Sequence, residues 1–261
     1  SFDPSAGRAT QGWVIDSEMR NLFEVTRVEP DVKAIPENMN MLMVVHPRHL
    51  SQDTQYAIDQ FVLRGGHLIV FVDPYAESQP QTAGADPTLM LSEGKSSDLP
   101  ELFKAWGVDY NANKVVLDAQ RALEIQAQQN APPVRHLAVL GLGAEDSNAE
   151  DVISAQLGAI NISTAGSFAL APDAKVKLEP LLQSSAVAGL VDAERFSMLP
   201  DPNQLYADFS ATGERYAFAV RLKGELTTAF PERDVEGHLA KSVGSANIVL
   251  VADTDILTDR L

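Results

Sequence analysis

The segment MLMVVHPRHLSQDTQYAIDQFVLRGGHLIVFVDP, residues 41–74, decides the fold. Two continuous apolar runs, 41–45 and 67–72, have the length of strands and the composition typical of strands buried on both faces. Between them, apolar residues recur at helical spacing from Ser51, a residue type that caps helix N-termini, to Gly65, where glycine favours a helix end. Strand, helix and strand joined by short loops predict a right-handed βαβ unit with parallel strands.

The composition is that of a globular and strongly acidic protein. The chain has 261 residues, of which 45% are hydrophobic, enough for one large domain or two smaller ones. Its 36 acidic and 20 basic side chains give a formal net charge of −16, so we expect no nucleic-acid partner. The absence of cysteine excludes disulfides, a thiolate nucleophile and cysteine-ligated metals. No apolar run reaches the ~18–20 residues that span a bilayer.

The remaining sequence predicts an α/β core built from both ends of the chain, with a β-rich segment between them. Residues 13–22 favour a helix and 23–28 a strand, and because such a domain usually starts with a strand, we hypothesise that a first strand precedes Ser1. A helix over 99–106, a strand over 114–117 and a buried strand over 247–252 complete the core.

Longer alternating runs between these core elements predict antiparallel strands. These runs cover 134–142, 159–170, 176–191 and 215–230, with a helix over 200–209. We therefore predict a flavodoxin-like, open, mostly parallel sheet with an antiparallel segment inserted before the last strand. Its core comprises 1–120 plus 244–261, and residues 121–243 form the β-rich segment packed on it.

Polar residues that follow the two strands of the βαβ unit form the first candidate ligand-binding site. These residues are His46, Arg48, Asp73 and Tyr75. Ligands of open α/β sheets bind outside the carboxyl ends of the strands. His46 and Asp73 end neighbouring strands, so we expect them to approach each other, and an ion pair would raise the pKa of His46. The alternative is a structural pair that fixes two loops.

Asp253 and Asp255 form a secondary candidate site directly after the last predicted strand. Paired aspartates at such a position can hold Mg²⁺ and act as nucleophile and acid, as in haloacid-dehalogenase-type phosphatases. Those enzymes carry the motif near the start of the domain, whereas here it lies in the last nine residues. The alternative is helix capping and turn chemistry. The acidic pairs Glu145-Asp146 and Glu150-Asp151 are expected in solvated loops, and we predict no metal and no cofactor.

Three stretches resemble the GldG family, the auxiliary components of gliding-motility-type ABC transport systems. They are residues 41–74, the region from Trp13 to Val25, and the ending VLVADTDILTDR, residues 249–260. The resemblance implies membrane helices that flank a soluble extracytoplasmic region. It also implies a fold related to class I glutamine amidotransferases and ThuA-like proteins, with relatives in an intraflagellar transport protein and a β-galactosidase trimerisation domain.

The resemblance implies a non-catalytic domain, because this chain lacks the cysteine with which the related amidotransferases perform catalysis. We expect a binding or scaffolding domain on the extracytoplasmic (periplasmic) face of the cytoplasmic membrane, anchored by helices outside this sequence. Its expected partners are an ABC permease and ATPase, with a carbohydrate or another exported molecule as ligand. The alternatives are a metal- or carboxylate-dependent hydrolase that uses the strand-end aspartates, and an assembly domain without a small ligand.

Overall fold

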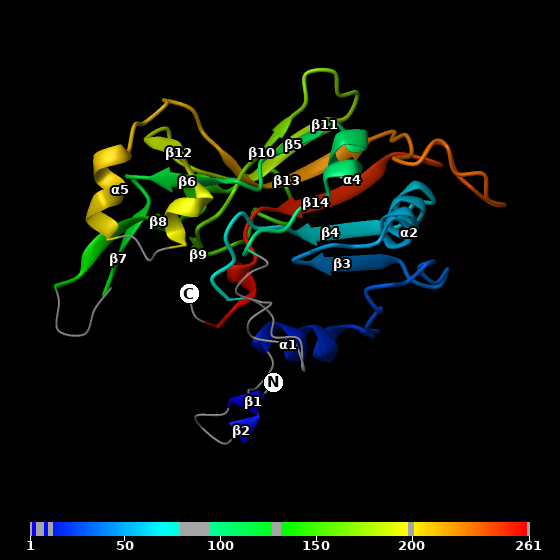
Figure 1. Cartoon of the computed structure of the whole chain (residues 1–261), viewed down its shortest axis with the longest axis horizontal. Coiled ribbons are helices and arrows are strands. Elements are labelled where there is room, and N and C mark those ends of the chain that lie inside the picture. Colours follow the sequence, from blue (N-terminus) through cyan, green and yellow to red (C-terminus); the bar gives the residue numbers. More distant parts are fainter. Residues whose placement is uncertain are drawn as a thin grey trace.

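The computed structural model describes residues 2–3, 8–9, 13–78, 94–126, 132–197 and 201–259, and it has a mixed α/β architecture (Figure 1). The central elements, in chain order, are β3 (Met41–Val45), α2 (Gln52–Leu63), β4 (His67–Phe71), α4 (Pro100–Trp106), β5 (Val108–Tyr110), β10 (Phe168–Leu170), β11 (Lys177–Gln183), β13 (Ala217–Gly224) and β14 (Ala246–Val251). The strands form one sheet in the order β3-β4-β14-β13-β10-β5, and β11 also pairs with β13.

The other elements form smaller sheets and peripheral pieces. They are β1 (Phe2–Asp3), β2 (Arg8–Ala9), α1 (Val14–Leu22), β6 (Lys114–Asp118), β7 (Ala122–Ile125), β8 (Val134–Leu142), β9 (Ile160–Ser163), β12 (Ala188–Asp192), α5 (Pro202–Asp208) and η3 (Asp255–Leu257). Strand β12 pairs with β6, β8 lies between β7 and β9, and β1 pairs with β2. Figure 1 shows the β12–β6 and β7–β8–β9 sheets and α5 beside the central sheet, at the end away from α2.

The predicted βαβ unit is confirmed. Strands β3 and β4 are parallel, and β4 is also parallel to β14, so the three strands end at the same edge of the sheet. The Ser51 hydroxyl accepts a hydrogen bond from the Thr54 N–H at 3.1 Å and caps α2. At the other end, Gly65 adopts φ +100°, and a Cβ on Gly66 would lie 2.4 Å from the Phe61 ring. The serine and glycine that predicted the ends of this helix thus lie at its ends in the structure.

Helix α2 covers one face of the parallel strands. Its buried side chains pack into the main core together with Leu42, Leu68 and Val70 from the facing side of β3 and β4. Burying each such side chain stabilises the fold by about 1.5–3 kcal/mol. This core also takes in α4, whose Trp106 is 1% exposed, and it fixes the position of the strand ends.

The prediction of a mostly parallel sheet is wrong. Only the β3–β4 and β4–β14 pairs are parallel, whereas β13 pairs antiparallel with β14, β10 and β11, and β10 pairs antiparallel with β5. Strands from the segment 121–243 extend the central sheet instead of only packing on it, because β13 pairs with β14 along its length. The division into 1–120 plus 244–261 and 121–243 stays a prediction.

Four predicted strands differ from the structure, and one of them, the run 215–230, forms a strand only over Ala217–Gly224. Residues 23–28 form no strand, and Val28 instead packs against the main core from an irregular segment. The run 159–170 is divided at Thr164, whose φ of +48° breaks the extended backbone between β9 and β10. The run 176–191 is divided between β11 and β12 at Ser184 and Ser185, which are buried and hydrogen-bonded in a turn.

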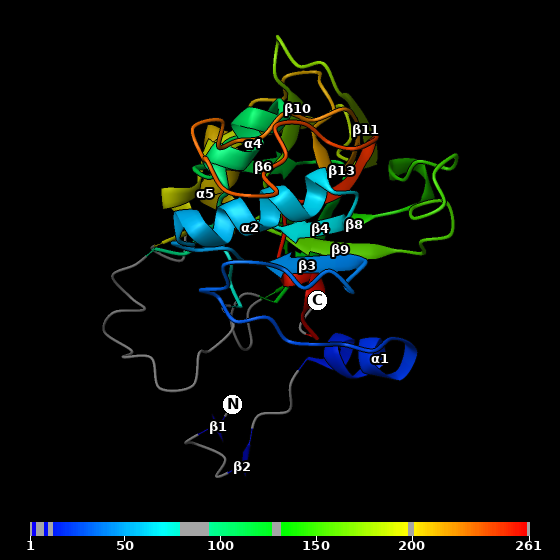
Figure 2. The same ribbon diagram turned by 90° about the vertical axis from the view of Figure 1, so that its right-hand side faces the viewer.

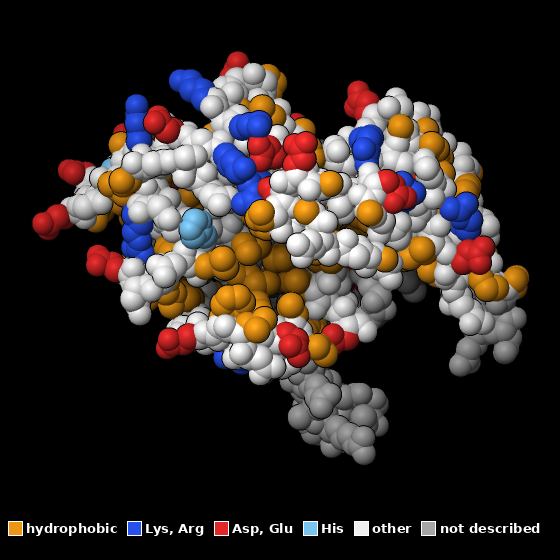
Figure 3. Space-filling view, turned by 180° about the vertical axis from the view of Figure 1, so that it is seen from behind, with side chains coloured by type: hydrophobic (Ala, Val, Ile, Leu, Met, Phe, Trp, Pro, Cys, Tyr) orange, Lys and Arg blue, Asp and Glu red, His pale blue; other side chains and the backbone are white. Residues whose placement is uncertain are grey.

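The strands β3 and β4 were predicted to be buried on both faces, and that prediction is wrong for the second face. Opposite α2, Met43 and Val45 of β3 and Ile69 and Phe71 of β4 are only partly buried. Figure 3 shows hydrophobic side chains gathered in a hollow at this place, above α1. Figure 2 shows α1 beyond β3, at the edge of the sheet. A continuous apolar run indicates two apolar faces, but it does not indicate that both are covered within the chain.

A bidentate ion pair attaches residues 148–157 to the second face of the sheet. The Arg221 guanidinium of β13 donates to both carboxylate oxygens of Asp151 at 2.7 Å, and to the Asn247 side chain at 2.8 Å. Both Asp151 and Arg221 are buried, so the expectation of a solvated Glu150-Asp151 pair is wrong for Asp151. The side-chain hydrogen bonds from Arg221, with a smaller contribution from its charge, lower the pKa of Asp151.

Replacing Asp151 with Ala leaves the buried Arg221 guanidinium without its anion, so we expect the free energy of unfolding to fall by about 2–4 kcal/mol. The matched control is Asp16→Ala, which removes the partner of Arg20 in an exposed pair at 3.1 Å and should cost less than about 1 kcal/mol. Urea unfolding of both variants measures the difference. Equal losses of stability would contradict a special role for the buried pair.

Candidate functional site

Three aspartates meet where the parallel strands end. Asp73 follows β4, Asp253 follows β14, and Asp255 begins η3. One carboxylate oxygen from each lies within 4.8 Å of the others, and the three residues are 0%, 0% and 2% exposed, respectively. The structure therefore unites Asp73 of the first predicted site with both residues of the secondary one.

The Asp73 carboxylate ties its own loop to the end of β14. Its Oδ1 accepts a hydrogen bond from the Tyr75 N–H at 2.8 Å. Its Oδ2 accepts hydrogen bonds from the N–H and the hydroxyl of Thr254, both at 2.8 Å. These bonds satisfy buried backbone donors that no strand or helix pairs.

The Asp253 carboxylate caps η3 and attaches it to the end of β9. Its Oδ1 accepts hydrogen bonds from the N–H groups of Asp255 at 2.6 Å and Ile256 at 3.2 Å. Its Oδ2 accepts a hydrogen bond from the Ser163 N–H at 2.9 Å. This arrangement is the capping chemistry that the sequence offered as the alternative to catalysis.

The Asp255 carboxylate completes the cluster from the other side. Its two oxygens accept hydrogen bonds from the N–H groups of Glu77 and Ser78, at 2.8 and 2.7 Å. Each oxygen of the three carboxylates therefore already accepts at least one hydrogen bond. The cluster joins the loop after β4, the end of β9 and the chain after β14.

Burial without a basic partner sets the protonation of the cluster. In the described part of the chain, no Lys, Arg or His forms an ion pair with Asp73, Asp253 or Asp255. Desolvation, followed by the charge of Asp255, raises the pKa of Asp253 to about 8. Desolvation and the two neighbouring carboxylates raise the pKa of Asp73 well above its usual value, and desolvation raises that of Asp255. The cluster therefore retains bound protons near neutral pH.

The geometry of the cluster suits a structural role better than a chemical one. Carboxylate oxygens are preferred ligands of Mg²⁺ and Ca²⁺, so the three side chains could hold a cation. A bound cation would compete with the backbone N–H groups that these oxygens now accept. A nucleophilic carboxylate needs an oxygen that substrate can reach, and Asp253 is fully buried.

The side chains of His46 and Tyr75, from the first predicted site, do not join this cluster. His46 is buried with φ +50°, and neither ring nitrogen has a hydrogen-bond partner among the described residues. Burial, with a smaller contribution from the charge of Arg48, lowers the pKa of His46 to about 4, the opposite of the shift expected from an ion pair with Asp73. The Tyr75 hydroxyl donates to the Phe196 carbonyl at 2.6 Å, and its ring lies 4.4 Å from the Lys95 ammonium.

A chain segment crosses the strand ends where the ligand was expected. The Ser97 N–H donates to the Asp73 carbonyl at 2.8 Å, and the Asp98 N–H to the Pro47 carbonyl at 3.4 Å. Residues 94–98 therefore lie over the loops after β3 and β4. Contact of a ligand with His46, Arg48, Asp73 and Tyr75 stays a prediction, and it requires this segment to move.

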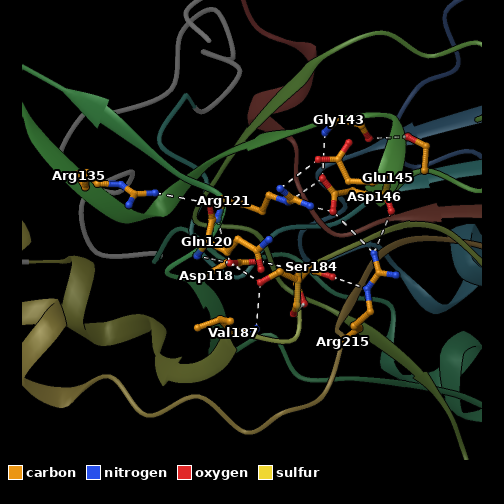
Figure 4. A network of polar contacts seen from close by, with 12 residues as sticks. Asp118, Gln120, Arg121, Arg135, Gly143, Glu145, Asp146, Ser184, Val187 and Arg215 are labelled. Carbon is orange, nitrogen blue, oxygen red and sulfur yellow. Dashed lines mark hydrogen bonds and ion pairs between the residues drawn. The ribbon is translucent and has the colours of Figure 1, made fainter.

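A second polar network lies among the small sheets (Figure 4). The Arg121 guanidinium pairs with Glu145 at 3.1 Å and with Asp146 at 2.8 Å, and Arg215 donates to the Ser184 carbonyl at 2.7 Å. The Asp146 side chain is fully buried, so the expectation of a solvated Glu145-Asp146 pair is wrong for this residue. No periodic pattern in the sequence predicts the burial of Asp146, because its partners Arg121 and Arg215 lie far from it along the chain.

An open depression borders this network. Its volume is about 360 Å³, and Glu145, Asn148, Glu150, Gln183 and Arg215 are among its lining residues. Small-molecule pockets reach such volumes, but they are mostly apolar and enclose their ligand. Its lining is largely polar and the depression is open, so it points to no ligand class.

Comparisons with known proteins place the chain. A family model described as an ABC-type uncharacterized transport system matches residues 3–261. A search of curated proteins finds no match. Among solved structures, the mmIFT52 N-terminal domain is similar over 95% of this chain and 80% of that one, with a TM-score of 0.49 and 10% identity.

The raised pKa of Asp253 predicts how stability depends on pH. The folded state holds a proton at pKa about 8 that the unfolded state releases near 3.8, so this stabilisation is complete in acid and is lost as the pH rises. His46 acts in the opposite sense, between about 4 and 6.5, so the range from pH 6.5 to 8 isolates the aspartates. There the free energy of unfolding should fall by up to about 1.4 kcal/mol per pH unit for one proton.

The Asp253→Asn variant should flatten this pH dependence, because Asn has no proton to release. Urea unfolding at several pH values between 6.5 and 8 measures the slope. The control is Asp234→Asn, which removes one exposed acidic group and should leave the slope unchanged. Parallel slopes for the wild type and Asp253→Asn would rule out proton retention by Asp253.

Proposed function

The chain belongs to the ABC-type uncharacterized transport system family, and from this premise we propose that it is a non-catalytic binding or scaffolding domain of an auxiliary transport component. In this proposal it associates with an ABC permease and an ATPase. It lies on the extracytoplasmic face of the cytoplasmic membrane, held there by helices outside this sequence.

The observation that carries the proposal is the extent of the family match. It runs from residue 3 to residue 261, so the family is defined by this domain and not by a short motif within it. No helix in the described ranges is long and apolar enough to cross a membrane. In this proposal, this domain provides the contacts of the auxiliary component.

The chemistry of the strand ends favours binding over catalysis. The three aspartates that a hydrolase would use are buried and already accept backbone hydrogen bonds. A carbohydrate or another exported molecule would contact the more exposed Arg48 and Tyr75 first, and would reach His46 and Asp73 only after residues 94–98 move. The proposal therefore places protein partners first and a small ligand second.

Crosslinking and capture of the membrane-anchored protein from its native cells, followed by mass spectrometry, tests the proposed association. We expect a permease and an ATPase among the captured proteins. Their absence, with the bait well recovered, would refute the transport role.

A panel of phosphate, ester and glycoside substrates, with and without Mg²⁺, tests the absence of catalysis. We expect no turnover above that of a heat-unfolded sample. Turnover that is lost in Asp253→Asn, but retained in Asp234→Asn, would instead establish the carboxylate-dependent hydrolase.

A further inference from the structure

The second face of β3 and β4 forms an apolar surface that the described chain leaves open. In the parallel register, Met43 lies beside Ile69 and Val45 beside Phe71, and these four side chains point away from α2. Ile69 and Phe71 are partly buried at the border of the second core cluster. We call these four residues the floor of the apolar hollow, which Figure 3 shows over β3 and β4.

On this face of the sheet, the covering segment extends over β13 and β14 but not over β4 and β3. The row that contains Met43 and Ile69 continues across the sheet to Val249 and Arg221. Arg221 holds Asp151, so residues 148–157 lie over β13 and β14 and form one wall of the hollow. This wall carries exposed apolar side chains, namely Val152, Ile153 and Leu157.

Helix α1 forms the opposite wall and has an apolar stripe without a buried residue. Ile15, Leu22 and Phe23 are exposed, and a contact that fixes the helix is the hydrogen bond from the Val14 N–H to Asp259 at 3.2 Å. An amphipathic helix of nine residues gains most of its stability by burying its apolar stripe. Both walls therefore carry exposed apolar side chains beside the partly buried apolar floor.

The strand beside the hollow also lacks the usual protection of a sheet edge. In the described part of the chain, β3 pairs only with β4. Its sequence, MLMVV, contains no charge and no proline, the two devices that commonly keep edge strands from associating. An uncharged edge next to an open apolar face is typical of a surface that another chain covers.

The shape of the surface favours a helix as its occupant. Parallel strands are normally covered by helices on both faces, and α2 covers only the first. The hollow is the corresponding place on the second face, bounded on two sides. A helix with an apolar stripe would cover the floor and contact both walls.

The charge of the walls favours a basic helix from a different protein. Helix α1 carries Asp16 and Glu18 against Arg20, and Glu150 is exposed on the opposite wall. The whole chain has a net charge of −16, so a second copy would bring the same acidic walls and the same charge. Lys or Arg beside the apolar stripe of a partner helix would meet these acids.

We propose that the apolar hollow binds an amphipathic helix of a transport subunit, with its apolar stripe on the floor and Lys or Arg along its edges. This proposal rests on the proposed function, since it names the surface and the kind of segment through which the association occurs. In this proposal, the partner helix is positioned by apolar contact with the floor, that is, with Met43, Val45, Ile69 and Phe71. The acidic side chains of the walls select a partner with Lys or Arg.

A binding measurement with a designed helix tests the chemistry of the surface. The probe is a fluorescent Leu/Lys amphipathic peptide of about 18 residues, long enough to form a helix. We expect Ile69→Gln to weaken its binding by about tenfold or more, and the matched control Val243→Gln, an exposed valine outside the hollow, to leave it unchanged. If Ile69→Gln unfolds, Leu22→Gln replaces it, because Leu22 is 74% exposed and supports no core.

A matched Leu/Glu peptide tests the contribution of charge. It should bind more weakly than the Leu/Lys peptide at low salt. Equal binding of the two peptides, or equal binding of the Leu/Lys peptide to wild type, Ile69→Gln and Leu22→Gln, would overturn the proposal.

Photocrosslinking of the full-length protein in its native cells identifies the occupant. A diazirine amino acid at Met41, which lies on the same face of β3 and is 59% exposed, is compared with the same group at Val243. A crosslink from Met41 to a basic amphipathic helix of the permease supports the proposal. A crosslink to lipid or to a second copy, or no excess over Val243, overturns it.

The same sample separates this proposal from the proposed function. If capture recovers the permease and ATPase but Met41 gives no crosslink to them, the association stands and the hollow is not its surface. If capture recovers neither protein, the transport role itself fails.

Discussion

Backbone N–H groups converge where the parallel strands end, and buried carboxylates are their acceptors. Asp73 binds the chain after β14, Asp253 binds the end of β9, and Asp255 binds the loop after β4. These bonds hold the ends of β4 and β14 together at one edge, and β3 joins this edge through its parallel pairing with β4. The rest of the central sheet extends from β14 by antiparallel pairing, so its position also depends on this edge.

The same hydrogen bonds occupy the carboxyl ends of the parallel strands, where an α/β sheet commonly binds its ligand. A carboxylate that accepts two or three backbone hydrogen bonds in a dry site is committed to structure, and its raised pKa records the energetic cost of burial. An apolar surface lies instead on the second sheet face, where Met43, Val45, Ile69 and Phe71 are only partly buried and no described helix lies over β3 and β4. The chain belongs to a transport family, and in the role proposed for it such a surface would serve contacts with a protein partner.

Sequence patterns predicted the βαβ unit well because each of its signals is local. Apolar runs, the Ser51 cap and Gly65 act over a few residues, and the structure confirms all of them. The antiparallel pairing of β13 and the break at Thr164 depend on contacts far along the chain, so strand length and direction were predicted less well there. Likewise, an apolar run reveals which residues avoid water, but not whether the same chain covers them.

The sequence analysis predicted which residues belong to the candidate site, but it did not predict how they are arranged. The sequence placed Asp73, Asp253 and Asp255 at strand ends, but only the order of strands brings β4 beside β14 and the carboxylates together. Hydrogen–deuterium exchange of the free protein and of its assembled transport complex tests the account most directly. It predicts new protection in α1 and in residues 41–45 on assembly, with residues 240–245 unchanged. Protection confined to other surfaces, or none at all, would contradict it.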